Sequence, residues 1–193
     1  MENKIEVFEL SKIYKIYKIK YNSQYTKNIF IKRIDENKNV IYKKVFKNLK
    51  NFEDKFLIEC PEFKSVNNYI INTLEKIENK KFKKIAKHSW IYKQTKDFNM
   101  VMHNHTYLLY TTEKTKLPTE WTSVFYIQLP KNVKNGEGDI VFMTEDKKLH
   151  QFSVEENDII IFPGRLHHMV IETPDAEIER VVFATNFNLN LNV

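Results

Sequence analysis

The chain has 193 residues, a length that suits one domain with a sizeable core. Hydrophobic residues make up 42% of the chain, a composition that excludes a disordered protein. The formal net charge of +6 would suit an anionic partner such as nucleic acid, but acidic residues lie among the lysines of the first half. Nucleic acid is therefore an open partner class that the sequence does not favour.

Two features bear on the compartment in which the protein works. The first residues, MENKIEVFELSK, contain no apolar stretch of the signal-peptide kind, and no run in the chain approaches the roughly 18 apolar residues of a membrane helix. Cys60 is the single cysteine, which excludes an intrachain disulfide and a cysteine-based metal site. We therefore expect a cytoplasmic protein that has no membrane partner.

The first 87 residues are expected to form an extension that packs on the rest of the chain. Residues 4–50 alternate loosely between apolar and polar side chains, which predicts strands joined by polar turns. Over residues 61–79 apolar side chains recur every three or four positions, and Pro61 stands at the start of the pattern. This segment is predicted to be an amphipathic helix that packs on the core.

The second part of the chain has the pattern of a β-sandwich. From Ser89 onward, seven or eight short segments are separated by turns such as PKNVKNGEG and TPDAE, with no helical pattern between them. This spacing favours a sandwich or barrel of the jelly-roll kind. We predict one domain over residues 1–193 that is mainly β with some α (α+β), with strands and a helix of residues 1–87 packed on a core of residues 88–193.

Two histidine clusters suit a metal ion. The segment MHNH places His103 and His105 two residues apart, and side chains two apart on a strand point to the same face. Imidazole is a good ligand for divalent transition metals, and a catalytic site needs about three protein ligands. A third histidine would come from another strand, at His167 or His168, which begin a strand after the turn at Gly164.

Strand parity selects between the two adjacent histidines. If TPDAE closes a hairpin between LHHMVIE and IERVVFATNF, Val170 lies roughly opposite Arg180. His168 and Arg180 then project to the same face, whereas His167 faces away from it. A guanidinium group there could bind the far carboxylate of a ligand whose near end chelates the metal, because arginine suits bidentate carboxylate recognition.

The order of these segments resembles a known family. The segments HNH, WTSVFYIQLP, GDIVF, NDIIIFPGRLHHMV and ERVVFATNF resemble the iron(II)/2-oxoglutarate-dependent oxygenases, above all the small prolyl-hydroxylase-like group found in phages and bacteria. The resemblance covers residues 88–190 and implies a double-stranded β-helix core, Fe(II) as cofactor, and 2-oxoglutarate and dioxygen as co-substrates. It assigns His103 and His168 to the metal and Arg180 to 2-oxoglutarate.

The chain departs from the family pattern at two positions. The acidic metal ligand of the family falls at His105, so the site would hold either three histidines or a carboxylate supplied by Glu113 or Glu120. Val182 stands where many members have a hydroxyl group. The distal carboxylate of 2-oxoglutarate is then expected to contact Tyr92, Tyr126 or Thr122.

The leading hypothesis is an oxidoreductase, namely an Fe(II)- and 2-oxoglutarate-dependent dioxygenase that hydroxylates an unidentified substrate. A protein side chain, a nucleobase and a small metabolite are all open as substrates. A cupin-like metalloenzyme that does not use 2-oxoglutarate would explain the same histidines, with Arg180 binding a different carboxylate. A non-enzymatic jelly-roll binding protein is the alternative outside the enzymes, and metal content would separate it from the other two.

Overall fold

The computed structural model describes residues 4–22, 25–36, 60–82, 86–94, 101–106, 109–110, 116–117, 119–174 and 176–189. Its first half contains β1 (Ile5–Glu9), β2 (Lys15–Lys20), α1 (Lys27–Glu36), α4 (Pro61–Ile77) and β3 (Ala86–Gln94). The described elements of the second half are all strands: β4 (Leu109–Tyr110), β5 (Lys116–Leu117), β6 (Trp121–Gln128), β7 (Ile140–Met143), β8 (Leu149–Phe152), β9 (Asp158–Pro163), β10 (His167–Val170) and β11 (Arg180–Asn188).

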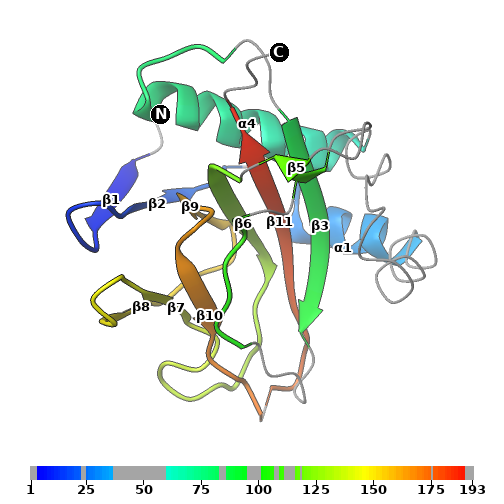
Figure 1. Ribbon diagram of the computed structural model, residues 1–193. Helices are drawn as coiled ribbons and strands as arrows, with labels where there is room; N and C mark the ends of the chain where they lie inside the picture. Colours follow the sequence, from blue (N-terminus) through cyan, green and yellow to red (C-terminus); the bar gives the residue numbers. More distant parts are fainter. Residues whose placement is uncertain are drawn as a thin grey trace.

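The strands form two facing sheets. The larger sheet has the strand order β1-β2-β9-β6-β11-β3 and the smaller one has the order β10-β7-β8, while β4 pairs with β5. All of these strand pairs are antiparallel. Figure 1 shows α1 and α4 behind the larger sheet and β7, β8 and β10 in front of it. The β-rich α+β class predicted from the sequence is thereby confirmed.

Helix α4 covers the larger sheet because its apolar side chains form one stripe. The stripe is fully buried and consists of Phe63, Val66, Ile70 and Leu74. Its first member packs on β11, with the rings of Phe63 and Phe183 centred 4.8 Å apart. The helix predicted over residues 61–79 is therefore confirmed, and it ends at Ile77.

The expectation of strands throughout residues 4–50 is wrong in one segment. Two strands, β1 and β2, form as predicted, but Lys27–Glu36 is the helix α1. The two buried side chains of this segment, Phe30 and Ile34, are four residues apart, so one helical face buries both of them. Residues 37–50 lie outside the described part of the chain.

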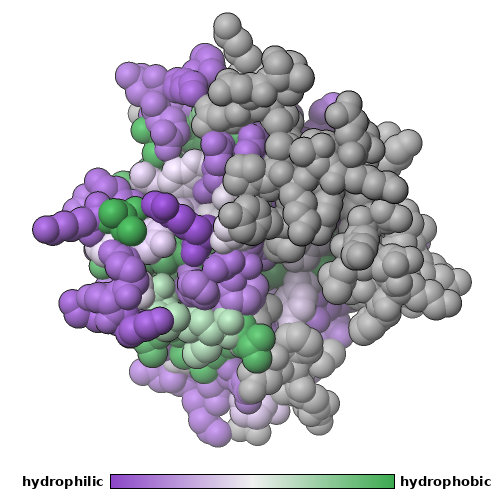
Figure 2. Space-filling view, in the orientation of Figure 1, coloured by the Kyte–Doolittle hydropathy of each residue, from purple (hydrophilic) through white to green (hydrophobic). Residues whose placement is uncertain are grey.

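Alternation along the strands of the larger sheet separates two apolar cores. On β9, Ile159 and Ile161 pack with the helices, whereas Ile160 and Phe162 pack toward the smaller sheet. The functional side chains described below lie in this second layer, between the two sheets. The outer surface in Figure 2 is mostly hydrophilic where it is described, with smaller hydrophobic patches between.

The hairpin predicted between the last two strands is wrong. β10 pairs with β7 in the smaller sheet, and β11 pairs with β3 and β6 in the larger sheet. Val170 consequently lies opposite Ile140, and Arg180 lies opposite Gln94. β10 and β11 therefore belong to different sheets, and a short turn sequence does not distinguish a connection between two sheets from a hairpin within one sheet.

None of the helices in the described residues is long and apolar enough to cross a membrane.

Candidate metal centre and anion pocket

Three histidine side chains meet between the two sheets. Each of His103, His105 and His168 offers a ring nitrogen, and these three nitrogens all lie within 4.8 Å of one another. The closest pair is Nε2 of His105 and Nε2 of His168, which are 3.2 Å apart. The rings of His105 and His168 are nearly parallel, at 14°, and that of His103 is inclined to both. Three ring nitrogens this close can face one metal ion.

Backbone hydrogen bonds hold the first two histidines beside β10. His103 and His168 form an isolated β-bridge, in which each backbone N–H donates to the other residue's carbonyl at 3.0 and 2.8 Å. The backbone N–H of His105 donates to the carbonyl of Gly164 at 2.8 Å. The sequence predicted a continuous strand here. Within residues 101–106 only His103 forms a β-bridge, but the imidazoles of His103 and His105 still reach the same cluster.

The two adjacent histidines of β10 face opposite ways. His168 is buried, whereas His167 is exposed and its Nε2 lies 3.1 Å from the side-chain amide nitrogen of Asn104. Strand parity therefore identified His168, the residue that faces the interior. It did so although the hairpin on which it was based does not form, because alternation within β10 alone separates the two side chains.

Carbonyl groups orient two of the three imidazoles. Nδ1 of His103 lies 2.9 Å from the carbonyl oxygen of Val101, and Nδ1 of His168 lies 3.2 Å from that of Leu166. A carbonyl oxygen only accepts, so in each ring Nδ1 carries the proton and donates it. The Nε2 atoms of His103 and His168 are left with lone pairs, the form in which imidazole binds a metal.

Burial keeps the two inner imidazoles neutral. It lowers the pKa of His105 to about 3, helped by the nearby His103 and His88, and it lowers the pKa of His168 well below the usual value. A neutral imidazole has one unprotonated ring nitrogen, so it does not have to release a proton to bind a metal ion. The donor set therefore fits a divalent transition metal.

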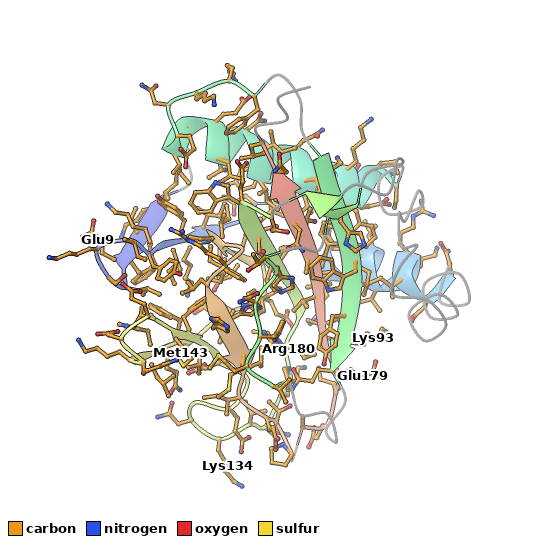
Figure 3. The ribbon with its side chains drawn as sticks, in the orientation of Figure 1. Glu9, Lys93, Lys134, Met143, Glu179 and Arg180 are labelled. Carbon is orange, nitrogen blue, oxygen red and sulfur yellow. The ribbon has the colours of Figure 1, made fainter. Side chains whose placement is uncertain are left out.

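A buried guanidinium group shares this cavity. Arg180 is only 2% exposed, and its side chain lies over the ring of Tyr126, with Cζ 5.0 Å from the ring centre. Its Nη1 donates to Gln94 Oε1 at 3.4 Å, and its Nε makes no hydrogen bond to the described residues. It forms no ion pair with a described residue, whereas the adjacent Glu179 pairs with Lys93 at 3.4 Å. Figure 3 labels these three charged residues at one end of β3 and β11.

A buried cation without an anionic partner is unfavourable, so this arrangement favours an anionic ligand. Two phenols lie beside Arg180: burial raises the pKa of Tyr92 to about 12 and also raises the pKa of Tyr126. Both therefore keep their protons at neutral pH and can donate hydrogen bonds. The Tyr126 hydroxyl is buried beside Arg180, which interacts with it, and it meets no partner at full hydrogen-bond geometry among the described residues.

The histidines and the arginine line one cavity of about 70 Å³. The larger sheet contributes Tyr92, Thr122 and Tyr126, which were the residues expected to contact 2-oxoglutarate. It also contributes Trp90, whose ring stacks on His105 at a centroid distance of 5.4 Å and an interplanar angle of 22°. Trp90 thus covers one face of a candidate ligand.

The structure places one of the two alternative carboxylates away from the histidines. Glu120 accepts a hydrogen bond from the backbone N–H of Leu189 at 2.6 Å, and it lines a different groove with Trp121 and Arg165. Glu120 therefore does not join the three histidines. Glu113, the other alternative, lies outside the described residues.

Comparison with known proteins finds similarity in structure but not in sequence. No family model and no curated protein matches the chain. A prolyl 4-hydroxylase from Phytophthora capsici superposes with a TM-score of 0.63 at 9% identity, over 90% of this chain and 58% of that chain. HygX from Streptomyces hygroscopicus superposes with a TM-score of 0.54 at 10% identity, both in its iron-bound structure and in its structure with nickel and 2-oxoglutarate bound.

This chain has the fold of the prolyl 4-hydroxylases and of HygX. The two HygX structures match 90% and 91% of this chain and 83% and 82% of HygX. The chain spans less than two thirds of the length of the Phytophthora prolyl 4-hydroxylase. The family resemblance drawn from the sequence is thereby confirmed at the level of the fold.

One residue beside the histidine cluster, Asn186, was not predicted from the sequence. Its side-chain amide nitrogen lies 3.3 Å from Nδ1 of His105, and its Oδ1 accepts a hydrogen bond from Thr122 Oγ1 at 2.8 Å. Asn186 lies six residues after Arg180 on β11, so the two share strand parity and project to the same face of the larger sheet. That parity is the signal by which the sequence could have identified it.

Proposed function

We propose that this protein is an Fe(II)- and 2-oxoglutarate-dependent dioxygenase that hydroxylates a substrate still to be identified. One observation carries the proposal: three clustered imidazoles share a cavity with a buried guanidinium group that forms no ion pair with the described residues. A metal ligand set and a buried cation that line one cavity suit a co-substrate with a chelating end and a carboxylate end.

In this proposal His103, His105 and His168 hold the iron. Iron, when bound with 2-oxoglutarate and dioxygen, supplies the oxidising power for hydroxylation of a C–H bond. Arg180 binds the distal carboxylate of 2-oxoglutarate, since its guanidinium group has no competing anionic partner among the described residues. Its planar fork can hold both carboxylate oxygens and so fix the orientation of the co-substrate.

The remaining residues of the cavity bind, orient and exclude water. Tyr126 has a buried, protonated hydroxyl that can donate to the distal carboxylate, and Tyr92 and Thr122 lie in the same wall. Trp90 shields His105 on its ring face. An apolar wall keeps water away from reactive groups and strengthens the electrostatic contacts within the site.

The fold supports the same proposal. We interpret the two facing sheets as a double-stranded β-helix core formed by residues 88–193, with residues 1–87 packed on it in a single domain. HygX, which is similar in structure, has been crystallised with iron and with nickel and 2-oxoglutarate. The net charge of the three-histidine ligand set proposed here would be one unit more positive than that of two histidines and one carboxylate.

Anaerobic titration with Fe(II) and 2-oxoglutarate tests the proposal. We expect a visible metal-to-ligand charge-transfer band, and release of succinate when oxygen is admitted. Arg180→Gln should weaken 2-oxoglutarate binding roughly 100-fold and leave metal binding intact, because it removes one partner of a buried charge pair. The matched control is Arg165→Gln, at an exposed arginine that lies over Tyr14 outside the cavity.

The same titration separates the alternatives. Stoichiometric metal binding without the charge-transfer band would contradict the use of 2-oxoglutarate and would favour a cupin-like metalloenzyme. Absence of both metal binding and the band would overturn the enzyme proposal and leave a jelly-roll binding protein.

A further inference from the structure

The last residue of β3 lies beside the buried arginine of the cavity. Gln94 and Arg180 are directly opposite each other in the antiparallel pairing of β3 with β11, and Nη1 of Arg180 donates to Gln94 Oε1 at 3.4 Å. Gln94 is 1% exposed and Arg180 is 2% exposed. Side chains in directly opposite positions project to the same face of a sheet, so the amide and the guanidinium group are cross-strand neighbours.

The pairing with β3 also fixes where Arg180 lies. On the other side of β11, the register with β6 shifts between Val181 and Val182, and the pairing of these two strands ends at Val181. The register with β3 continues without a shift from Asn188 to Arg180. Because an irregularity of this kind bends and twists the strands locally, β3 is the strand that determines the position of Arg180.

The opposite face of the sheet compensates its cation with carboxylates. Lys93, which precedes Gln94 on β3, forms ion pairs with Asp35 of α1 and with Glu179, each at an N–O distance of 3.4 Å. On the cavity face, by contrast, Arg180 has an amide beside it and forms no ion pair with a described residue. Two adjacent residues of β3 thus face two cations in different ways.

An amide oxygen orients a guanidinium group without neutralising it. It accepts a hydrogen bond but carries no net charge, whereas a carboxylate in the same place would form a charge-assisted, bidentate pair with the arginine. Such a pair would compete with every anionic ligand. The nearby Asp139 acts on Arg180 only through its field, and its Oδ2 accepts a hydrogen bond from Gln151 Nε2 at 2.8 Å.

We propose that Gln94 is a positioning residue whose neutral side chain holds the guanidinium group of Arg180 and leaves its positive charge uncompensated until the carboxylate of a ligand enters the cavity. The ligand-free protein is less stable for this reason, because a buried cation without a counter-charge is unfavourable. The inference rests on the part of the proposed function that gives Arg180 an anionic ligand, but it requires neither iron nor 2-oxoglutarate.

Urea unfolding of the ligand-free protein at pH 7 in EDTA provides the first test. Gln94→Glu keeps the size of the side chain and supplies a counter-charge, so we expect a higher midpoint of unfolding than in the parent protein. Gln94→Leu removes the acceptor, so we expect a lower midpoint. A merely structural glutamine would lose stability in both variants, and a lower midpoint in both would overturn the proposal.

The gain in stability should depend on Arg180. In the background of Arg180→Gln, the substitution Gln94→Glu buries a carboxylate that has no cation beside it, so there it should lower the midpoint. A gain that persists in the absence of Arg180 would contradict the proposal.

Binding of 2-oxoglutarate to the Ni(II)-loaded protein provides the second test, by isothermal titration calorimetry without oxygen. Gln94→Glu should weaken binding roughly 100-fold, because its carboxylate occupies the guanidinium group. Gln94→Leu should weaken it about 10-fold, because one orienting hydrogen bond is lost. Ni(II) affinity should stay the same in both variants. Unchanged 2-oxoglutarate affinity in Gln94→Glu would overturn the positioning role.

The matched control is Gln128→Glu, which makes the same charge change at a half-buried glutamine of β6. Gln128 Nε2 donates to the backbone carbonyl of Glu179 at 2.8 Å, and Gln128 does not line the cavity. The control is needed because the chain has a formal net charge of +6, so an added carboxylate can reduce self-repulsion wherever it lies. We expect neither a higher midpoint nor weaker 2-oxoglutarate binding. An equal rise of the midpoint in the control would assign the gain to net charge and contradict the proposal.

The two tests also separate this inference from the proposed function. Opposite stability effects of Gln94→Glu and Gln94→Leu, without a charge-transfer band in the iron titration, would retain the role of Gln94 and reject 2-oxoglutarate as the ligand. A charge-transfer band in the parent protein without these opposite effects would retain 2-oxoglutarate and reject the role of Gln94.

Discussion

At the scale of single residues, His167 and His168 allow a direct comparison of an exposed and a buried histidine. They are neighbours in the chain, yet one is exposed and the other is buried within the histidine cluster. We expect His168→Ala to abolish stoichiometric binding of Ni(II) or Co(II), and His167→Ala to leave it nearly unchanged, as isothermal titration calorimetry would measure. Equal losses in the two variants would show that the metal does not bind where the three rings meet.

Gly164 matters to the same cluster for a steric reason. A Cβ at this position would lie 2.6 Å from the backbone oxygen of Thr119, which is closer than such atoms approach. The carbonyl of Gly164 also accepts the backbone N–H of His105 at 2.8 Å. We therefore expect Gly164→Ala to shift His105, to lower metal affinity and to cost about 1–3 kcal/mol of stability. Unchanged calorimetry and urea unfolding would contradict this expectation.

At the scale of elements, a polar contact fixes α4 on the larger sheet. Thr185 Oγ1 donates to Asn67 Oδ1 at 2.9 Å and lies 2.8 Å from Ser89 Oγ, all within a buried layer. Thr185→Val leaves Asn67 Oδ1 without the hydroxyl that donates to it, so we expect a loss of about 1–3 kcal/mol in the free energy of unfolding by urea. Metal affinity of the folded protein should not change, because this layer lies on the opposite face of the sheet.

Thr73→Val provides the control for that measurement. The Thr73 hydroxyl donates only within α4, to the carbonyl of Tyr69 at 2.9 Å. Removal of the Thr73 hydroxyl should lower the free energy of unfolding clearly less than removal of the Thr185 hydroxyl. If both variants lost the same free energy of unfolding, the contact between α4 and the sheet would stabilise the protein no more than a hydrogen bond within the helix.

At the scale of the whole molecule, the buried imidazoles make stability depend on pH. An imidazole in the unfolded chain has a pKa near 6.5, whereas that of folded His105 is about 3 and that of His168 is also lowered. Between these values the unfolded chain binds more protons, so stability falls as pH falls below about 6.5. Each imidazole contributes a slope of up to about 1.4 kcal/mol per pH unit.

Urea unfolding at pH 7 and pH 5 in the presence of EDTA measures this slope. Carboxylates stay largely ionised over that interval, so histidines dominate the difference. His105→Gln should reduce the slope, and the matched substitution His167→Gln, at an exposed side chain, should not. A slope that is the same in His105→Gln and in the parent protein would contradict the burial argument.

The sequence predicted the elements whose signal is local. The helix Pro61–Ile77 follows from side chains that recur every three or four residues, and the later strands follow from short apolar segments between turns. The opposite orientation of His167 and His168 also follows from local alternation. These features depend on neighbours a few residues apart, which the sequence displays directly.

Only the tertiary structure decided which strands lie together. His168 and Arg180 belong to different sheets, and they share a cavity because both sheets turn their inner faces toward it. The contact of Asn186 with His105, and the distance of Glu120 from the histidines, likewise depend on pairing between distant segments. A turn sequence specifies a change of direction but not the partner of the next strand, since that choice is made by burial across the whole core.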